Sequence, residues 1–149
     1  MEQQRVRELA QQFIDGLHAL EQAEGDGQAE VAALVALYAD DAHLTNAALK
    51  LVGDERRGRD AIAKVWSEYK RTLGRAYSDF HQVTTSETAA GLFWVTRGTN
   101  VDGQQDAVAY DGATLLVFDA AGKITFFQGY YDTRQLNREM GVNQQVGKS

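Results

Sequence analysis

The 149-residue chain contains no cysteine and no proline. Without cysteine it cannot form disulfide bonds, use a thiolate nucleophile or build a metal site on thiolates. Without proline, none of its turns depends on the fixed φ of a proline ring. Long apolar runs are also missing, because the longest has nine residues (31–39), whereas a bilayer span needs about 20. The first residues lack the apolar segment of a signal peptide, so we expect a cytoplasmic protein without membrane contact.

Basic residues are fewer than acidic ones, 15 against 21, and the net charge is −6. This acidity argues against nucleic acid or an anionic membrane as the main partner. The hydrophobic share of 44% is typical of a globular chain, and the length suits one core. We therefore expect a single domain over 1–149, with a core at about 5–140 and a flexible tail at 141–149.

Apolar residues at helical spacing predict three helices in the first half of the chain. The apolar stripes cover 6–20, 31–38 and 61–73. Glycines in EGDGQ (24–28) separate the first two helices, and a polar turn at 50–58 precedes the third. We expect the acids Asp40 and Asp41 to end the second helix, which is a structural role.

The second half is rich in Val, Thr and aromatic residues, which favour strands. The predicted strands are 42–46, 76–86, 90–101, 107–118 and 123–131. DGQQ (102–105) and AAGK (120–123) are expected to be hairpin connections. The acid-x-x-Gln spacing of Asp132 and Gln135 predicts a short helix after the last strand. Helices followed by consecutive strands indicate an α+β fold, with an antiparallel sheet covered by helices on one face.

Four stretches resemble the SnoaL-like, nuclear-transport-factor-2-like superfamily. They are FIDGL (13–17), YADDAHLTN (38–46), RGRDAIAKVW (57–66) and VFDAAGKITFFQGYYD (117–132). The resemblance implies a cone-shaped barrel, in which a curved antiparallel sheet wraps around three N-terminal helices, and a homodimer formed through the sheet. It implies little about function, because the superfamily includes isomerases, epoxide hydrolases, cyclases, dehydratases and non-catalytic binding proteins.

The resemblance to ketosteroid isomerase does not extend to its catalytic groups. The position of the proton-transferring carboxylate is Asn46, and an amide cannot act as a general base near neutral pH. The positions of the two oxyanion-hole residues, a tyrosine and a protonated aspartate, are Phe13 and Thr114. Steroid-isomerase chemistry is therefore disfavoured.

Limonene-epoxide hydrolase is the closer comparison among superfamily members. Its asparagine and arginine match Asn46 and Arg97, whereas Leu44 stands at the position of its tyrosine. Its two aspartates are replaced by Thr99 and Gly129. Because neither carboxylate remains, the resemblance disfavours epoxide hydrolysis by that mechanism.

Strand alternation extends these alignments to a pocket lining. If Arg97 faces the cavity, Phe93 and Val95 face it as well, while Trp94 points outward and is explained by subunit contact. The expected ligand-binding residues are Phe13, Leu17, Leu44, Trp66, Phe93, Val95, Thr99, Thr114, Leu116 and Phe127. Such an apolar chamber suits a small hydrophobic molecule, or one that also bears a carbonyl or acid group.

Four polar residues are the candidate catalytic groups, and each has a structural alternative. Arg97 could bind an anionic or carbonyl-bearing ligand, or form an ion pair with an acid on a neighbouring element. Asn46 could orient a ligand or water, or tie down the chain that follows it. Tyr110 and Tyr131 could donate a hydrogen bond to a ligand oxygen, or be core aromatic residues.

The histidines do not form a recognisable metal site. His18 and Glu21 have the i, i+3 spacing of two metal ligands on a helix, but no third ligand has matching spacing, so a solvated pair is favoured. His43 has the opposite strand parity to Asn46 and is expected to face away from the cavity. We therefore expect neither a metal nor another cofactor.

Two functions remain open. One is a cofactor-free isomerase, cyclase, hydratase or hydrolase that acts on a small hydrophobic metabolite through Asn46, Arg97 and Tyr110 or Tyr131. The other is a non-catalytic ligand-binding or dimerisation module on the same fold. The missing carboxylates favour the second function, while Asn46 and Arg97 keep the first in consideration.

Overall fold

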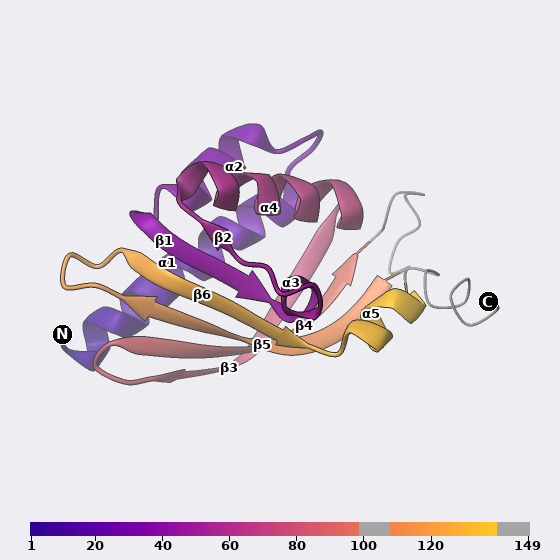
Figure 1. Ribbon diagram of the computed structural model, residues 1–149. Helices are drawn as coiled ribbons and strands as arrows, with labels where there is room; N and C mark the ends of the chain where they lie inside the picture. The colour runs from indigo at the N-terminus through magenta and orange to yellow at the C-terminus, as the bar shows by residue number, and fades with distance from the viewer. Residues whose placement is uncertain (99–107, 140–149) are drawn as a thin grey trace.

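A computed structural model describes residues 1–98 and 108–139. The elements in chain order are α1 (Gln3–Gln22), α2 (Gln28–Val35), β1 (Tyr38–Asn46), α3 (Ala47–Leu51), β2 (Arg56–Arg57), α4 (Arg59–Leu73), β3 (Ala76–Thr85), β4 (Ala89–Gly98), β5 (Val108–Phe118), β6 (Ile124–Tyr131) and α5 (Thr133–Glu139) (Figure 1). The predicted connection at 102–105, the predicted pocket residue Thr99 and the predicted tail at 141–149 lie outside the described residues.

The strands form one curved sheet in the order β2-β1-β6-β5-β4-β3. The α+β prediction is confirmed, but the sheet is open and mixed rather than purely antiparallel, because β1 and β6 pair in parallel. The strands from β3 to β6 pair antiparallel with their neighbours in the chain, as predicted. No hairpin links β1 to β6, so the local sequence places no such constraint on their direction.

The predicted apolar stripes form the inner faces of the three long helices. Figure 1 shows α1, α2 and α4 on one side of the curved sheet. On α1 the buried residues recur at helical spacing, from Val6 through Phe13 to Leu20. The predicted break is confirmed: α1 ends at Gln22, and Gly27, the N-cap of α2, has a φ of 65°, which favours glycine.

The region around Asp40 and Asp41 differs from the prediction. The helix α2 ends at Val35, and both acids are exposed residues within β1, where the pairing with β6 shifts register. Asp40 forms a 3.0 Å ion pair with Arg59, which also donates two hydrogen bonds to the backbone oxygen of Tyr38. Asp40 therefore has a structural contact, as expected, but neither acid ends a helix.

The alternation of β4 is opposite to the prediction. Trp94 and Thr96 are buried, 7% and 2% exposed, whereas Arg97 is exposed. Side chains alternate strictly along a strand, so one wrong assignment reverses every residue of that strand. Phe93 and Val95 consequently lie on the face of the sheet opposite to Trp94. The buried Trp94 therefore gives no support for subunit contact, and the homodimer remains a prediction.

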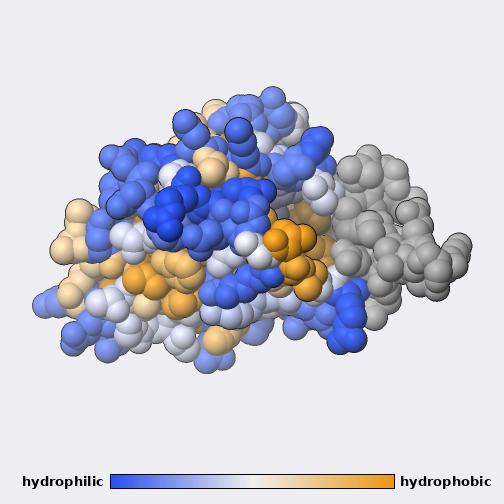
Figure 2. Space-filling model, viewed as in Figure 1, coloured by the Kyte–Doolittle hydropathy of each residue, from blue (hydrophilic) through white to orange (hydrophobic). Residues whose placement is uncertain are grey.

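Polar residues cover most of the face seen in Figure 2, while apolar residues gather over α3. There Leu51 and Val52 are 71% and 75% exposed. The sequence does not predict α3, which overlaps the start of the expected polar turn at 50–58. Among the described residues, no helix is long and apolar enough to cross a membrane.

Candidate functional site

A cavity of about 420 Å³ lies between the helices and the sheet. Its walls come from α1, α3, α4, α5 and all six strands of the described sheet, so residues distant in the chain meet there. Aromatic rings dominate the lining: Phe13, Trp66, Tyr69, Phe80, Trp94, Tyr110, Phe127 and Tyr131. The cone is therefore not filled by its own side chains, which leaves room for a small molecule.

The structure brings most of the predicted site residues together. The cavity is lined by eight of them: Phe13, Leu17, Asn46, Trp66, Tyr110, Thr114, Phe127 and Tyr131. Leu44 and Leu116 also face the interior, but they are fully buried in the core and do not line the cavity. Contact of the eight lining residues with a ligand stays a prediction.

Arg97, Phe93 and Val95 do not belong to the cavity. Arg97 pairs with Tyr77 on β3 and Ala109 on β5, and its side chain is exposed on the face away from the helices. The prediction that these three residues face the cavity is wrong, because the predicted strand parity rests on the alignment of Arg97 and Thr99 with cavity residues of a relative. The burial of Trp94 and Thr96 shows the opposite parity.

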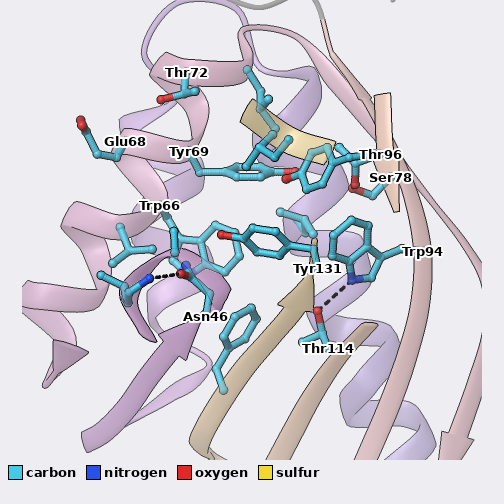
Figure 3. A pocket seen from close by; sticks show the side chains of 18 of the residues that line it. Asn46, Trp66, Glu68, Tyr69, Thr72, Ser78, Trp94, Thr96, Thr114 and Tyr131 are labelled. Atoms are coloured by element: carbon cyan, nitrogen blue, oxygen red, sulfur yellow. Dashed lines mark hydrogen bonds between the residues drawn. The ribbon is translucent and has the colours of Figure 1, made fainter. Parts of the chain in front are cut away.

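Asn46 occupies one end of the cavity, where β1 passes into α3 (Figure 3). Its Oδ1 accepts a 2.9 Å hydrogen bond from the backbone N–H of Leu49, which makes Asn46 the N-cap of α3. An asparagine at this position satisfies a backbone donor that the short helix leaves unpaired. Of the two roles considered, the structure shows the capping one, and the rest of the amide faces the cavity.

Tyr131 lies at the same end. Figure 3 shows its hydroxyl pointing toward the side of the cavity where Asn46 and Trp66 lie. Burial raises the pKa of Tyr131, and a hydrogen bond to the backbone of Ala48 partly offsets that effect. The residue is therefore a neutral phenol at physiological pH, able to donate or accept a hydrogen bond.

Behind the other end of the cavity lies a buried carboxylate, Glu21, which the sequence analysis did not include among the site residues. Glu21 is 1% exposed and accepts a 2.5 Å hydrogen bond from the Tyr69 hydroxyl. Its two oxygens also accept hydrogen bonds from Ser78, at 2.9 Å from the backbone N–H and 2.5 Å from the hydroxyl. A further 2.6 Å contact joins Ser78 to Thr96. Tyr69, Ser78 and Thr96 line the cavity in front of Glu21.

The expected solvated pair of His18 and Glu21 is therefore wrong. The His18 ring stacks on Tyr77 at 4.7 Å, and its Nε2 lies 2.7 Å from the backbone oxygen of Ser78. A signal for burial of Glu21 was present in the sequence: it lies four residues after Leu17, on the apolar stripe of its helix. A charged residue on such a stripe indicates a buried polar contact.

A buried lysine lies beside this carboxylate. Lys70 is 4% exposed, and its Nζ donates to the backbone oxygens of Glu21, Ala23 and Gly74. These carbonyls belong to the ends of α1 and α4, where a cation is favoured by the helix dipole. Burial lowers the pKa of Lys70; Arg75 adds to the decrease, while Glu21 opposes it.

Tyr69 and Tyr110 remain protonated near neutral pH. Burial is the main reason that the pKa of each phenol is raised, and the nearby Glu21 carboxylate adds to the rise in both. The Tyr110 ring packs edge-to-face on Trp94 at 5.3 Å and on Tyr131 at 5.6 Å. Trp94 is fixed in turn by a 2.9 Å hydrogen bond from its Nε1 to the hydroxyl of Thr114.

Apart from Glu68, whose exposed side chain lines the cavity, the acids and histidines of the described residues do not line it. His43 faces away from it, as predicted, and pairs with Glu55 at 3.4 Å. Over residues 1–98 and 108–139, no three histidine or acidic side chains lie close enough together to hold a metal ion. The lining therefore offers phenols, hydroxyls, an amide and the charged side chains of Arg56, Lys64 and Glu68, while the carboxylate of Glu21 lies behind the hydroxyls.

Residues 10–127 match the family model of the SnoaL-like domain, which covers most of the chain. This chain belongs to the SnoaL-like family. No curated protein is similar enough in sequence to match it.

Solved structures share the fold of this SnoaL-like chain at low sequence identity. A protein of ketosteroid isomerase-like fold from Catenulispora acidiphila, in complex with trimethylamine, is 18% identical, with a TM-score of 0.68 over 87% of this chain and 92% of that one. A SnoaL-like protein of unknown function from Burkholderia thailandensis is 13% identical, with a TM-score of 0.66 over 89% and 98%. A de novo designed protein with a curved β-sheet is 10% identical, with a TM-score of 0.65 over 97% and 99%.

At these identities the likeness supports the fold alone, and a designed protein shares it. The SnoaL-like fold places this chain in a superfamily of small-molecule-binding proteins, while the particular ligand or reaction depends on its own side chains. In this SnoaL-like chain, the buried carboxylate comes from the end of α1. Asn46, which the resemblance to ketosteroid isomerase aligns with the catalytic carboxylate, is the cap of α3.

Proposed function

We propose that this SnoaL-like chain binds a small, largely apolar molecule in the cavity. The observation that supports the proposal is the cavity itself, about 420 Å³ in volume and lined mainly by aromatic rings. Cavities that hold small ligands have volumes of roughly 300–1,000 Å³ and similar apolar walls with a few polar groups. Phe13, Trp66 and Phe127 form the apolar middle, with ring centroids 5.5 to 6.1 Å apart.

The two ends of the cavity would orient such a ligand. One end presents the Tyr131 hydroxyl and the amide of Asn46, and the other presents the hydroxyls in front of Glu21. The expected acid-bearing ligand loses its main support, because Arg97 is outside the cavity. The trimethylamine complex belongs to a relative that shares only the fold, so the ligand class is inferred from this chain's own side chains.

A second candidate function is cofactor-free acid–base catalysis, favoured by the hydrogen bond between Tyr69 and Glu21. In this role the Tyr69 oxygen would take a proton from the ligand while its own proton moves to the Glu21 carboxylate. Such a relay suits an isomerase, cyclase or hydratase. This pair replaces the predicted catalytic residues Asn46, Arg97 and a tyrosine, because Arg97 lies outside the cavity.

Binding can be tested with the neutral naphthalene dye prodan. Both tryptophans of the chain, Trp66 and Trp94, line the cavity, so excitation of tryptophan should produce saturable emission from bound dye. Replacement of both by phenylalanine should remove this energy transfer, while directly excited dye still reports binding. Absence of saturable binding by the wild-type protein would refute the proposal.

The catalytic candidate needs a reaction, and native mass spectrometry of protein from its own host can supply the molecule. A co-purified ligand would be incubated with wild-type protein and with Tyr69→Phe. Conversion by the wild-type protein alone would support the proton relay. Unchanged recovery of the ligand from both would leave binding as the function.

A further inference from the structure

The end of the cavity next to Glu21 presents hydroxyl oxygens that have no hydrogen to donate. Tyr69 and Ser78 both direct their hydroxyl hydrogens at Oε2 of Glu21. Because the Ser78 hydrogen is used there, the contact between Ser78 and Thr96 must use the Thr96 hydrogen. The oxygens of Tyr69, Ser78 and Thr96, which we call the acceptor wall, keep lone pairs. The acceptor wall therefore accepts hydrogen bonds from a ligand and donates none.

A negative charge lies directly behind the acceptor wall. Glu21 accepts three hydrogen bonds, which is the pattern of an ionised carboxylate. The buried cation beside it, Lys70, directs its hydrogens at backbone oxygens of Glu21, Ala23 and Gly74 rather than at the carboxylate. Lys70 thus offsets the charge of Glu21 without a direct hydrogen bond to its carboxylate. The hydrogen bonds that the carboxylate does accept polarise the hydroxyls that line the cavity.

Aromatic rings surround the space in front of the acceptor wall. Tyr110, Trp94 and Tyr131 pack against one another with centroids 5.3 to 6.5 Å apart, and all three line the cavity together with Tyr69. Electron-rich ring faces attract a cation, most strongly where water is excluded. A carboxylate-backed acceptor site combined with aromatic rings favours a positively charged hydrogen-bond donor.

We propose that the acceptor wall holds the protonated amine of an otherwise apolar ligand. This inference rests on the proposed function, because it assigns the polar end of a molecule bound in the same cavity. It also reverses the expectation from the sequence, which was a carbonyl or acid group bound by Arg97. The ligand class is an aryl- or alkylammonium compound small enough for about 420 Å³.

Charged residues also line the mouth of the cavity, but they do not decide the ligand's charge. Arg56 pairs with Asp54, and Glu68 pairs with Arg71. Lys64 is exposed on α4. Charges in contact with solvent are screened and contribute little to binding a group that sits inside the cavity.

The test is competition against prodan by four compounds that differ in one polar group: 2-phenylethylamine, 2-phenylethanol, 4-phenyl-2-butanone and 3-phenylpropionate. At pH 7 the amine should displace the dye at a concentration about tenfold lower than the alcohol, and the acid should compete least. Equal or tighter binding of the alcohol, ketone or acid would overturn the amine proposal while leaving the proposed function intact. If prodan itself does not bind, both proposals fail.

The decisive variant is Glu21→Gln. A glutamine Nε2 would donate to the oxygens of Tyr69 and Ser78 and thereby release their hydrogens toward the cavity. The preference should then turn from the amine to the ketone. The matched control is Glu24→Gln, which makes the same change in net charge at an exposed position three residues later and should keep the amine preference.

A second variant keeps the test decisive if Glu21→Gln does not fold. Tyr69→Phe removes one oxygen of the acceptor wall and leaves Glu21 bonded to Ser78. It should weaken binding of 2-phenylethylamine relative to 2-phenylethanol by about threefold to tenfold. An amine affinity equal to that of the wild type would count against the acceptor wall.

Discussion

The hydroxyl of Tyr69 on α4 donates a 2.5 Å hydrogen bond to Oε2 of Glu21 on α1. The same carboxylate accepts both hydrogen bonds from Ser78 on β3, so one buried side chain joins two helices and a strand. Ser78 and Tyr69 line the cavity. The hydrogen bonds of Glu21 that hold α1, α4 and β3 together therefore also determine how the Tyr69 and Ser78 hydroxyls present hydrogen-bonding groups to the cavity.

Replacement of Glu21 by alanine should destabilise the protein by about 3 kcal/mol, because three buried donors lose their acceptor and Lys70 loses a nearby charge. Urea unfolding followed by tryptophan fluorescence measures the free energy. The control is Glu24→Ala, which is exposed and should change stability by less than about 0.5 kcal/mol. A Glu21→Ala protein as stable as the control would contradict the buried network.

Gly112 and Gly129 form a matched pair on adjacent strands. A Cβ at Gly112 would collide with the backbone oxygen of Tyr130 and lie 2.8 Å from the Trp94 ring. A Cβ at Gly129 would lie 3.4 Å from the Asn46 side chain. Gly112→Ala should therefore cost about 1–3 kcal/mol or more, and Gly129→Ala much less. Thermal unfolding of the two variants tests this order, and equal melting temperatures would contradict it.

Asn46→Ala should destabilise the short helix α3 without unfolding the domain. The lost hydrogen bond to the Leu49 N–H is worth about 1 kcal/mol. Asn46→Asp should retain the cap, because aspartate accepts the same bond. Hydrogen exchange of the amides at 47–51 reports the change. Equal protection in the alanine and aspartate variants would show that the cap is not needed.

Arg97→Gln should leave both stability and prodan affinity near wild-type values, within about 0.5 kcal/mol. The side chain is exposed on the face of β4 opposite to Trp94, which lines the cavity. Dye titration and urea unfolding of the variant measure the two quantities. A large loss of dye affinity would restore the role that the sequence suggested for this residue.

Stability should fall as pH rises above 10. The pKa values of Tyr38, Tyr69, Tyr110 and Tyr131 are raised, chiefly by burial, above the ordinary value of 10.0. Above that pH the unfolded chain releases protons that the folded chain still holds, so unfolding becomes more favourable. Each phenol's stabilising contribution is present below pH 10 and is lost as pH rises toward its folded pKa.

Urea midpoints measured between pH 8 and pH 11 test this alkaline instability, with absorbance at 295 nm following tyrosine ionisation. The lowered pKa of Lys70 has the opposite effect on stability. Between the folded pKa of Lys70 and its ordinary value of 10.5, the unfolded chain holds a proton that the folded chain has released, so stability rises with pH in that range. Tyr110→Phe should make the alkaline loss shallower. A midpoint that does not change up to pH 11 would contradict the burial of these phenols.

The α+β fold and much of the cavity lining followed from patterns within short segments. Apolar residues at helical spacing identified α1, α2 and α4, and β-branched and aromatic segments identified the strands from β3 to β6. The sequence correctly places four residues inside, because the helix or strand period and the family resemblance assign them to the same face: Phe13, Trp66, Thr114 and Phe127. These features are local, so the sequence by itself determined them.

The tertiary structure decided which face each strand presents and which polar groups meet. The parity of β4 is a choice between two faces, and only packing against the helices places Trp94 inside and Arg97 outside. The partners of Glu21 lie 48 and 57 residues away in the chain, so no local pattern contains them. The helical spacing of Glu21 placed it on a buried face, but only folding supplied the hydroxyls that make its burial possible.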